Sequence, residues 1–185
     1  MRTYKEMGSE ELLAIGLKAA DGQAPDYETL TDVWLEFKRR GRDAKAGAYA
    51  AKLAKRGFPP VTWLAAARDV AARFVRKKPG RHHVYVVLLD GFVASGERYG
   101  LYVGETRRRP EERFKQHQSG GKLAARCHRK MRALLPSLFE HLNPLDREEA
   151  RQLEVELVLA FESARMRVHG PRELKPCKPR SLESI

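Results

Sequence analysis

Two tyrosines in separate apolar segments are the first residues whose types and spacing could do chemistry. Tyr85 stands within Val84–Leu89, and Tyr102 stands within Leu101–Val103. A hairpin with a symmetric loop would pair these two positions, so that the phenols would share one face with Cβ atoms about 5 Å apart. A strand tyrosine taken alone is more often a packing residue, and a register shift of one residue would separate the pair.

An arginine and a histidine follow at a spacing that places them on the same side of a helix. Arg113 and His117 are four residues apart, after a proline at position 110 and acidic residues in the first turn. Such a pair projects from one helix face. A guanidinium matches phosphate oxygens in a fork, so the pair suits an anionic, phosphate-bearing substrate. The alternative is an exposed basic helix face.

A glutamate near the C-terminus is the candidate ligand for a metal ion. Glu154 precedes Leu157 and Val158 on a segment whose apolar residues recur at helical spacing. A carboxylate at the edge of a buried face either points into solvent or binds a hard cation such as Mg²⁺ or Mn²⁺. Glu156 and Glu162 have the same claim on spacing alone.

The elements that must position these residues fall into two parts. The first 80 residues are expected to be helical, because apolar residues recur every three or four positions and glycines or prolines separate the periodic segments. The segment Lys77–Gly80 is the best candidate linker, and the composition changes after it. Four helices are predicted. The first begins near Ser9, the second includes Leu30–Phe37, the third spans Ala44–Arg56, and the fourth includes Trp63–Phe74.

The second part mixes strands and helices. Val84–Leu89 is apolar on both alternating faces, which is typical of a strand that is covered on both sides. Leu101–Val103 predicts a second short strand. Three helices are then expected from Pro110 to near Gly120, from about Lys122 to Leu135, and from near Asp146 through Phe161, with a loose tail from Pro171.

The net charge points to a polyanionic partner. The 185 residues include 36 lysines and arginines against 24 acids, a formal charge of +12. Arg107–Arg132 holds ten of these bases and two acids, and Glu36–Arg56 holds eight and two. Such an excess attracts nucleic acid, the commonest soluble polyanion, although a solvated basic surface is the simpler reading.

Four sequence blocks together resemble the GIY-YIG nuclease domain over about residues 82–170. The first glycine of the family pattern is His83 here, the loop between the two tyrosines is longer than usual, and the asparagine often found near the domain end has no counterpart in Arg167–Gly170. The order and gaps of the blocks are far more specific than any single one. They are His83-Val84-Tyr85, Tyr102-Val103-Gly104-Glu105-Thr106, Arg109–His117 and Leu153–Val158.

This resemblance implies an α+β fold with a small central antiparallel sheet of three strands flanked by helices. An all-helical region, residues 1–80, would precede the nuclease-like domain, residues 81–170, and residues 171–185 would form the loose tail. The resemblance also implies hydrolysis of phosphodiester bonds with one divalent cation, Mg²⁺ or Mn²⁺.

The resemblance assigns a role to each candidate residue. Tyr85 would be the general base, with His117 assisting, although an ordinary tyrosine pKa near 10 requires a cationic neighbourhood. Arg113 would stabilise charge in the transition state, Glu154 would hold the metal, and Tyr102 would position water or phosphate. Gly104 would allow close approach of the backbone.

Basic residues around these blocks would hold the backbone of the substrate, with DNA favoured over RNA. A non-catalytic nucleic-acid-binding module on the same fold is the alternative function. The N-terminal helices, with Lys38–Arg42 and the lysines of the third helix, could add specificity or simply pack on the second part. The expected contact residues are Arg107, Arg108, Arg109, Lys115, Lys122, Arg126, Arg129 and Lys130.

The remaining features concern the cellular setting. The most apolar stretch is six residues long, against about 18 needed for a membrane span, so no membrane association is expected. Charge begins at Arg2 and leaves no room for a signal peptide, which predicts a cytoplasmic protein. Cys127 and Cys177 are both expected to be free thiols, because their spacing fits no zinc motif.

Overall fold

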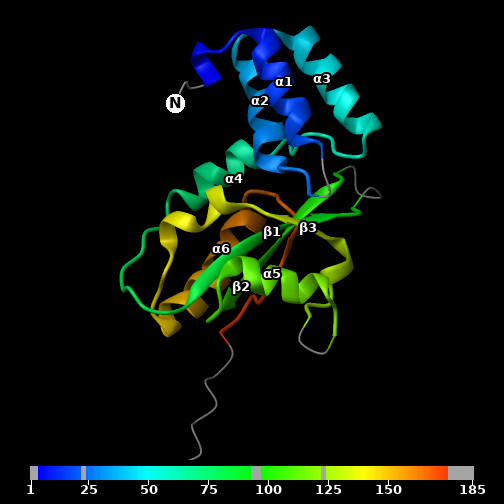
Figure 1. Cartoon of the computed structure of the whole chain (residues 1–185). Coiled ribbons are helices and arrows are strands. Elements are labelled where there is room, and N and C mark those ends of the chain that lie inside the picture. The colour runs from blue at the N-terminus through cyan, green and yellow to red at the C-terminus, as the bar shows by residue number, and fades with distance from the viewer. Residues whose placement is uncertain (1–3, 22–23, 93–96, 122–123, 175–185) are drawn as a thin grey trace, which may run out of the picture.

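Three N-terminal helices surround a hydrophobic core of their own. The computed structural model describes residues 4–21, 24–92, 97–121 and 124–174. After a short 3-10 turn, Tyr4–Glu6, the helices are α1 (Ser9–Ala19), α2 (Tyr27–Arg39) and α3 (Asp43–Lys55), which lie together at the top of Figure 1. Their shared core consists of Leu12, Ala20, Leu30, Val33, Phe37, Ala46, Tyr49 and Leu53.

Local signals explain where these helices begin and end. The Asp26 side chain accepts a hydrogen bond from the Thr29 backbone N–H at 3.1 Å and so caps the start of α2. Gly41 and Gly57 follow α2 and α3 with φ of 66° and 87°, left-handed values that favour glycine at a helix end. The four helices expected in the first 80 residues are confirmed.

The fourth helix packs against the sheet rather than into the core of the first three helices. Helix α4 (Leu64–Ala71) buries Leu64, Ala67 and Val70 in the same hydrophobic cluster as the strands. The backbone N–H groups of Lys77 and Lys78 donate to the Glu149 carboxylate at 2.5 and 2.7 Å, which ties the expected linker to the helix Arg147–Ser163.

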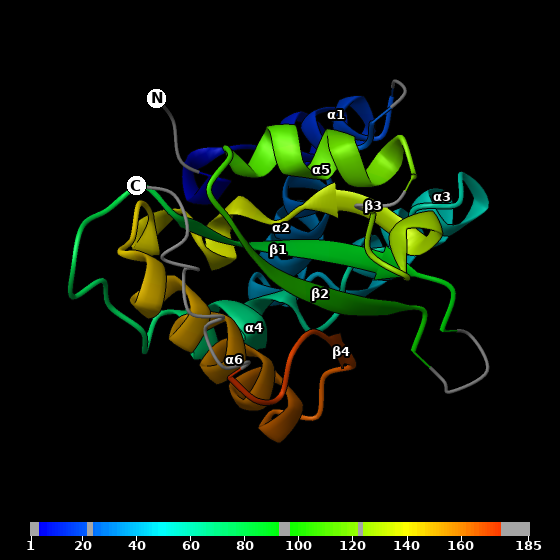
Figure 2. The ribbon, with the colours of Figure 1, turned by 90° about the horizontal axis from the view of Figure 1, so that it is seen from below.

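The sheet has four strands in the order β3-β1-β2-β4 (Figure 2). Strand β1 (His83–Asp90) pairs antiparallel with both β2 (Tyr99–Thr106) and β3 (Met131–Leu134). The α+β class is confirmed, but the expectation of a purely antiparallel three-stranded sheet is wrong. A fourth strand, β4 (Val168–His169), pairs with β2 in parallel, and the Leu101 N–H donates to the Arg167 carbonyl at 2.7 Å.

The register of the β1–β2 hairpin also differs from the expectation. Tyr85 pairs with Gly104, and Tyr102 pairs with Val87, two positions from the expected Tyr85–Tyr102 pair. The centre of the loop lies one position further along the chain than a Tyr85–Tyr102 pair would place it, because pairing ends at Asp90 and Tyr99. A shift of two residues keeps both tyrosines on one face, whereas a shift of one would not.

The basic α-helix expected from Lys122 to Leu135 is wrong over residues 124–135, the part of it that the structure describes. A 3-10 turn, His128–Lys130, leads into β3, and the Leu135 N–H donates to the Val86 carbonyl at 2.9 Å. Apolar Met131 and Leu135 are buried against the sheet, so pairing with β1 overrides the local helix preference of a lysine- and arginine-rich segment. Two 3-10 turns, Pro136–Leu138 and Glu140–Leu142, follow.

Helices cover both faces of the sheet, as the apolar β1 sequence predicts. Helix α5 (Pro110–Gln118) packs on β1 and β3, and α6 (Arg147–Ser163) packs on β1, β2 and β4 on the opposite side (Figure 1). The Asp146 carboxylate accepts from the Glu148 N–H at 3.0 Å and caps α6. None of the helices in the described ranges is long and apolar enough to cross a membrane.

Candidate active site

Three aromatic side chains from three elements meet on the face of the sheet covered by α5. They are Tyr85 of β1, Tyr102 of β2 and His117 of α5. The ring centroids lie 5.9 Å apart for the two tyrosines, 6.1 Å for Tyr85 and His117, and 5.7 Å for Tyr102 and His117. The cluster is mostly enclosed, because Tyr85 is 1% exposed and His117 is fully buried, while Tyr102 is half-buried.

The hydrogen bonds of His117 define its tautomer. The Ala125 backbone N–H lies 2.9 Å from Nδ1, and a backbone amide can only donate, so Nδ1 carries no proton. The hydrogen of the neutral ring is therefore on Nε2, which donates to the Tyr85 hydroxyl at 2.8 Å. Burial lowers the pKa of His117 to about 4, and the charges of Arg113 and His128 act in the same direction. His117 is thus a neutral donor at pH 7.

Burial also shifts the pKa values of the two phenols. It raises the pKa of Tyr85 and of Tyr102 above their ordinary values, and the Arg113 guanidinium opposes that rise at both. The hydroxyls of Tyr85 and Tyr102 are hydrogen-bonded to each other. Because the Tyr85 oxygen already accepts from His117, its own proton is free to point at Tyr102. The order of donation is therefore His117 to Tyr85 to Tyr102, from the buried side toward the more exposed phenol.

Gly104 is the residue that makes room for Tyr85. It lies directly opposite Tyr85 in the hairpin. A Cβ atom at position 104 would stand 2.6 Å from Cζ and Oη of Tyr85 and 2.9 Å from Cε1 of Tyr102. The Tyr85 ring therefore lies across a bare stretch of backbone, which is the close approach expected of this glycine.

Glu154 reaches the same site from α6 around the outer edge of β2. Amides of alternate residues point to one edge of a strand, and the Leu101 N–H already binds β4 there. At Glu105, beyond the short β4, the edge N–H instead donates to Glu154 Oε1 at 3.0 Å. The Glu154 charge also acts to raise the pKa of Tyr102, so this carboxylate is close enough to influence the phenol electrostatically.

Among the candidate residues, Glu154 is the carboxylate that could bind a hard cation. Among the described residues no group of three or more His, Cys, Asp or Glu side chains could hold a metal ion. Mg²⁺ is commonly bound by one or two carboxylates and completes its shell with water and substrate phosphate. The Glu154 carboxylate, whose Oε1 also accepts from the Glu105 N–H, could supply one ligand in that mode, whereas zinc would need more protein ligands.

The basic residues expected to hold the substrate lie on the surface around this cluster. All seven that the structure describes are exposed, and within the described ranges none of them forms an ion pair. Lys122 lies outside the described residues. The seven are Arg107, Arg108, Arg109, Lys115, Arg126, Arg129 and Lys130.

The N-terminal cations behave differently. Lys38 pairs with Asp43, and both Arg39 and Arg40 pair with Glu36. Arg40 also donates to the backbone carbonyls of Met7 and Tyr4 at 2.8 and 2.6 Å. The Arg40 bonds tie the end of α2 to the segment before α1, and these contacts favour the packing interpretation of Lys38–Arg40 over a role in substrate specificity.

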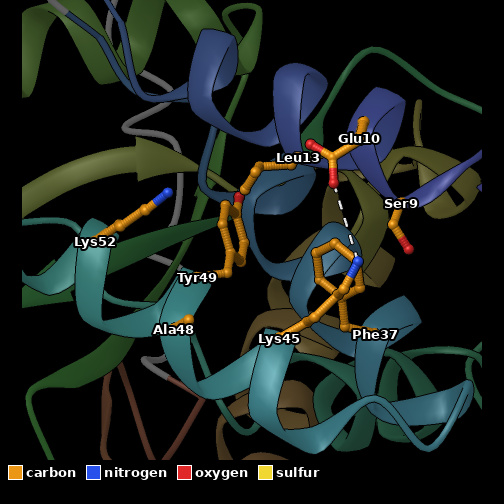
Figure 3. A pocket seen from close by; sticks show the side chains of 8 residues that line it. All are labelled: Ser9, Glu10, Leu13, Phe37, Lys45, Ala48, Tyr49 and Lys52. Carbon is orange, nitrogen blue, oxygen red and sulfur yellow. Dashed lines mark ion pairs between the residues drawn. The ribbon is translucent and has the colours of Figure 1, made fainter.

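Two small pockets of about 140 Å³ lie away from the aromatic cluster. One, between the N-terminal helices, is lined by side chains that include Tyr49 and Phe37, and Lys45 Nζ lies 3.9 Å from Glu10 Oε1 there (Figure 3). The other lies between the segment after α4 and the α6 surface. Neither contains a residue of the candidate site.

Sequence reasoning missed several neighbours of the cluster. The Ala125 amide sets the tautomer of His117, and no side-chain pattern could reveal a backbone donor. Cys127 lies close enough to Tyr102 to influence its titration and is a free thiol, as expected, whereas Cys177 lies outside the described residues. Phe92 and His169 also lie on this face of the sheet. The glycine at position 100 is the one sequence feature that could have indicated a ring packed against the strand there.

No protein-family model, curated protein or solved structure matches the chain. The candidate site therefore rests on the residues and the geometry given above.

Proposed function

We propose that the protein is a metal-dependent endonuclease of the GIY-YIG type that hydrolyses phosphodiester bonds, preferably in DNA, in the cytoplasm. One observation carries the proposal. The residues of the four separated sequence blocks meet at one place, where Tyr85, Tyr102 and His117 have ring centroids within about 6 Å of one another. Arg113 acts electrostatically on both phenols, and Glu154 acts on that of Tyr102.

In this proposal Tyr85 is the general base that accepts a proton from the attacking water. It must first lose its own proton, and His117 cannot take it, because Nε2 carries a hydrogen and Nδ1 accepts from Ala125. The Tyr85 proton passes instead to the oxygen of Tyr102, as the half-buried Tyr102 hydroxyl releases its own proton to solvent. The hydrogen bond from His117 and the positive charge of Arg113 both stabilise the resulting phenolate, which offsets part of the effect of burial.

Arg113 and Glu154 act on the phosphate. The Arg113 guanidinium stabilises the negative charge that grows on the phosphate oxygens in the transition state. Glu154 would hold a Mg²⁺ or Mn²⁺ ion, which when bound supplies a positive charge at the leaving oxygen. Tyr102 orients the water or the phosphate, and the exposed cations bind the backbone of the substrate.

The second candidate is a nucleic-acid-binding module without catalysis. It is favoured by the burial that raises the pKa of both tyrosines, since a protonated phenol is a poor base. It needs only the unpaired cations around α5 and would leave the tyrosines as packing residues.

Incubation of the purified protein with supercoiled plasmid, in Mg²⁺ and in EDTA, tests the proposal. Tyr85→Phe removes one hydroxyl from the site, and Tyr49→Phe removes another buried hydroxyl, bonded to the Leu30 carbonyl at 3.3 Å, from the N-terminal core. We expect nicking that requires Mg²⁺, persists in Y49F and falls at least about a hundredfold in Y85F. A salt-sensitive gel shift without cleavage would instead support the binding module.

A further inference from the structure

Strand β2 has two glycines on the face that α5 covers, one on each side of Tyr102 in the sequence. Gly100, Tyr102 and Gly104 alternate along the strand and therefore share a face. The Tyr85 ring lies across Gly104. At Gly100 a Cβ atom would stand 2.9 Å from Cε2 of Phe92, so the Phe92 ring lies across the second glycine. A row of rings thus follows β2, with Phe92 at one end and Tyr85 at the other.

His169 extends this row outward from the candidate site. It pairs with Tyr102 in the parallel ladder between β2 and β4, and aligned residues of such a pair project from the same face. The His169 and Phe92 ring centroids are 5.7 Å apart with planes inclined by 35°. Phe92 is half-buried, whereas His169 is exposed. The two rings therefore form an aromatic surface beside Tyr102 that is accessible to solvent.

Two cations border the same rings. Lys130 Nζ lies 4.3 Å from the Phe92 ring centroid, and the guanidinium carbon of Arg167 lies 5.8 Å from it. Both residues are exposed, and neither forms an ion pair with any residue that the structure describes. Burial, together with Lys130 and Arg172, lowers the pKa of His169, so at pH 7 its ring is a neutral stacking surface among positive charges.

We propose that Phe92, His169, Lys130 and Arg167, here called the Phe92 surface, bind an unpaired nucleotide next to the phosphate at the active site. The preferred substrate would then be single-stranded or branched nucleic acid. This inference rests on the proposed nuclease function and narrows its substrate class. Aromatic rings beside cations bind single strands because every base offers a π-face and every nucleotide a phosphate. In an intact duplex the bases are stacked on each other, so rings beside the backbone would contribute little.

Phosphate contact alone would not require this arrangement. Cations on an exposed surface bind a duplex backbone without aromatic partners, as proposed for the arginines that precede α5. Packing alone would account for Phe92 over Gly100, but it leaves the exposed ring of His169 and the two unpaired cations without a role.

Binding measured by fluorescence anisotropy in EDTA tests the inference. The probes are a labelled oligothymidine and a duplex of equal length, with the wild type and Phe92→Ala, Phe92→Leu and His169→Ala. Phe74→Ala, at a half-buried phenylalanine that lines the pocket beside α6, is the matched control. We expect F92A, F92L and H169A each to weaken oligothymidine binding about five- to fiftyfold, with duplex binding changed less than about twofold. F74A should leave both unchanged.

The outcomes separate this inference from the function on which it rests. Duplex binding with no preference for the single strand, and no effect of F92L or H169A, would overturn the Phe92 surface while leaving a nuclease possible. Binding to neither probe would overturn the proposed function and the inference together. His169 is exposed, so H169A carries the test if the Phe92 variants fail to fold.

Discussion

The hydroxyl of Tyr85 and Nε2 of His117 are 2.8 Å apart, and this hydrogen bond joins a central strand to the helix that covers it. The contact is directional, because the Ala125 amide occupies the other ring nitrogen. Three separate segments therefore determine which atom carries the proton. The arrangement keeps His117 neutral and makes it a donor to the proposed base rather than an acceptor from it.

Acid should destabilise the protein through His117. Its pKa is about 4 in the fold and about 6.5 when unfolded, so between these values the unfolded chain binds more protons. The contribution of His117 is complete above about pH 6.5 and is lost as the pH falls toward 4. We expect the difference in urea midpoint between wild type and His117→Gln to shrink over this window. Parallel midpoint curves for the two proteins would contradict a depressed pKa, since all other groups are shared.

Gly104 and Gly47 should respond oppositely to the same substitution. At Gly104 a methyl group would collide with the Tyr85 ring, whereas at the exposed helical Gly47 nothing lies within 4 Å of a Cβ. We expect Gly104→Ala to lower the free energy of unfolding by about 1–3 kcal/mol. Gly47→Ala should raise it by about 0.5–1 kcal/mol. Urea denaturation measures both, and a neutral G104A would show that Tyr85 does not need its present position.

Residues that act locally made most of the fold predictable. Polar caps such as Asp146, glycines after helices such as Gly41, and the apolar run of β1 act within a few residues of the elements they define. Strand β3 was missed because Met131 becomes a strand residue only by pairing with Leu89, more than 40 positions earlier. Strand β4 was missed for the same reason, since two residues carry no periodicity of their own.

The candidate site was predictable as a set of side chains but not as a network. Tyr85 and Tyr102 remain on one face although their pairing shifted by two positions, because side chains alternate with a period of two. The helical spacing of Arg113 and His117 did not reveal that His117 is fully buried. The roles themselves stay predictions, since geometry alone does not test catalysis.

Arg108 and Lys38 should differ in their contribution to DNA affinity. Arg108 is exposed before α5 without an ion pair among the described residues, whereas Lys38 is paired with Asp43. If Arg108 contacts a phosphate, Arg108→Gln should reduce the slope of log K against log salt by about 0.9 for duplex DNA. Lys38→Gln should leave the slope unchanged. The reverse result would show that the N-terminal helices hold the nucleic acid.

Glu154 should be required for cleavage and dispensable for binding. In Glu154→Gln the amide oxygen can still accept from the Glu105 N–H, so the edge of β2 keeps its hydrogen bond while the negative charge is lost. We expect plasmid cleavage to fall about a thousandfold or more, roughly 4 kcal/mol on the barrier, as it should in Glu154→Ala. DNA affinity in EDTA should stay within about threefold.

Glu156→Gln is the control on the same helix. Glu156 accepts from Gln152 Nε2 at 2.7 Å on the α6 surface, and removing its charge should leave cleavage unchanged. Calorimetric titration with Mg²⁺ in the presence of a non-cleavable phosphorothioate DNA gives an independent readout, in which E154Q and not E156Q should lose the metal-binding heat. Full cleavage by E154Q would overturn the assignment of the metal ligand, because Glu154 is the carboxylate whose charge acts on Tyr102.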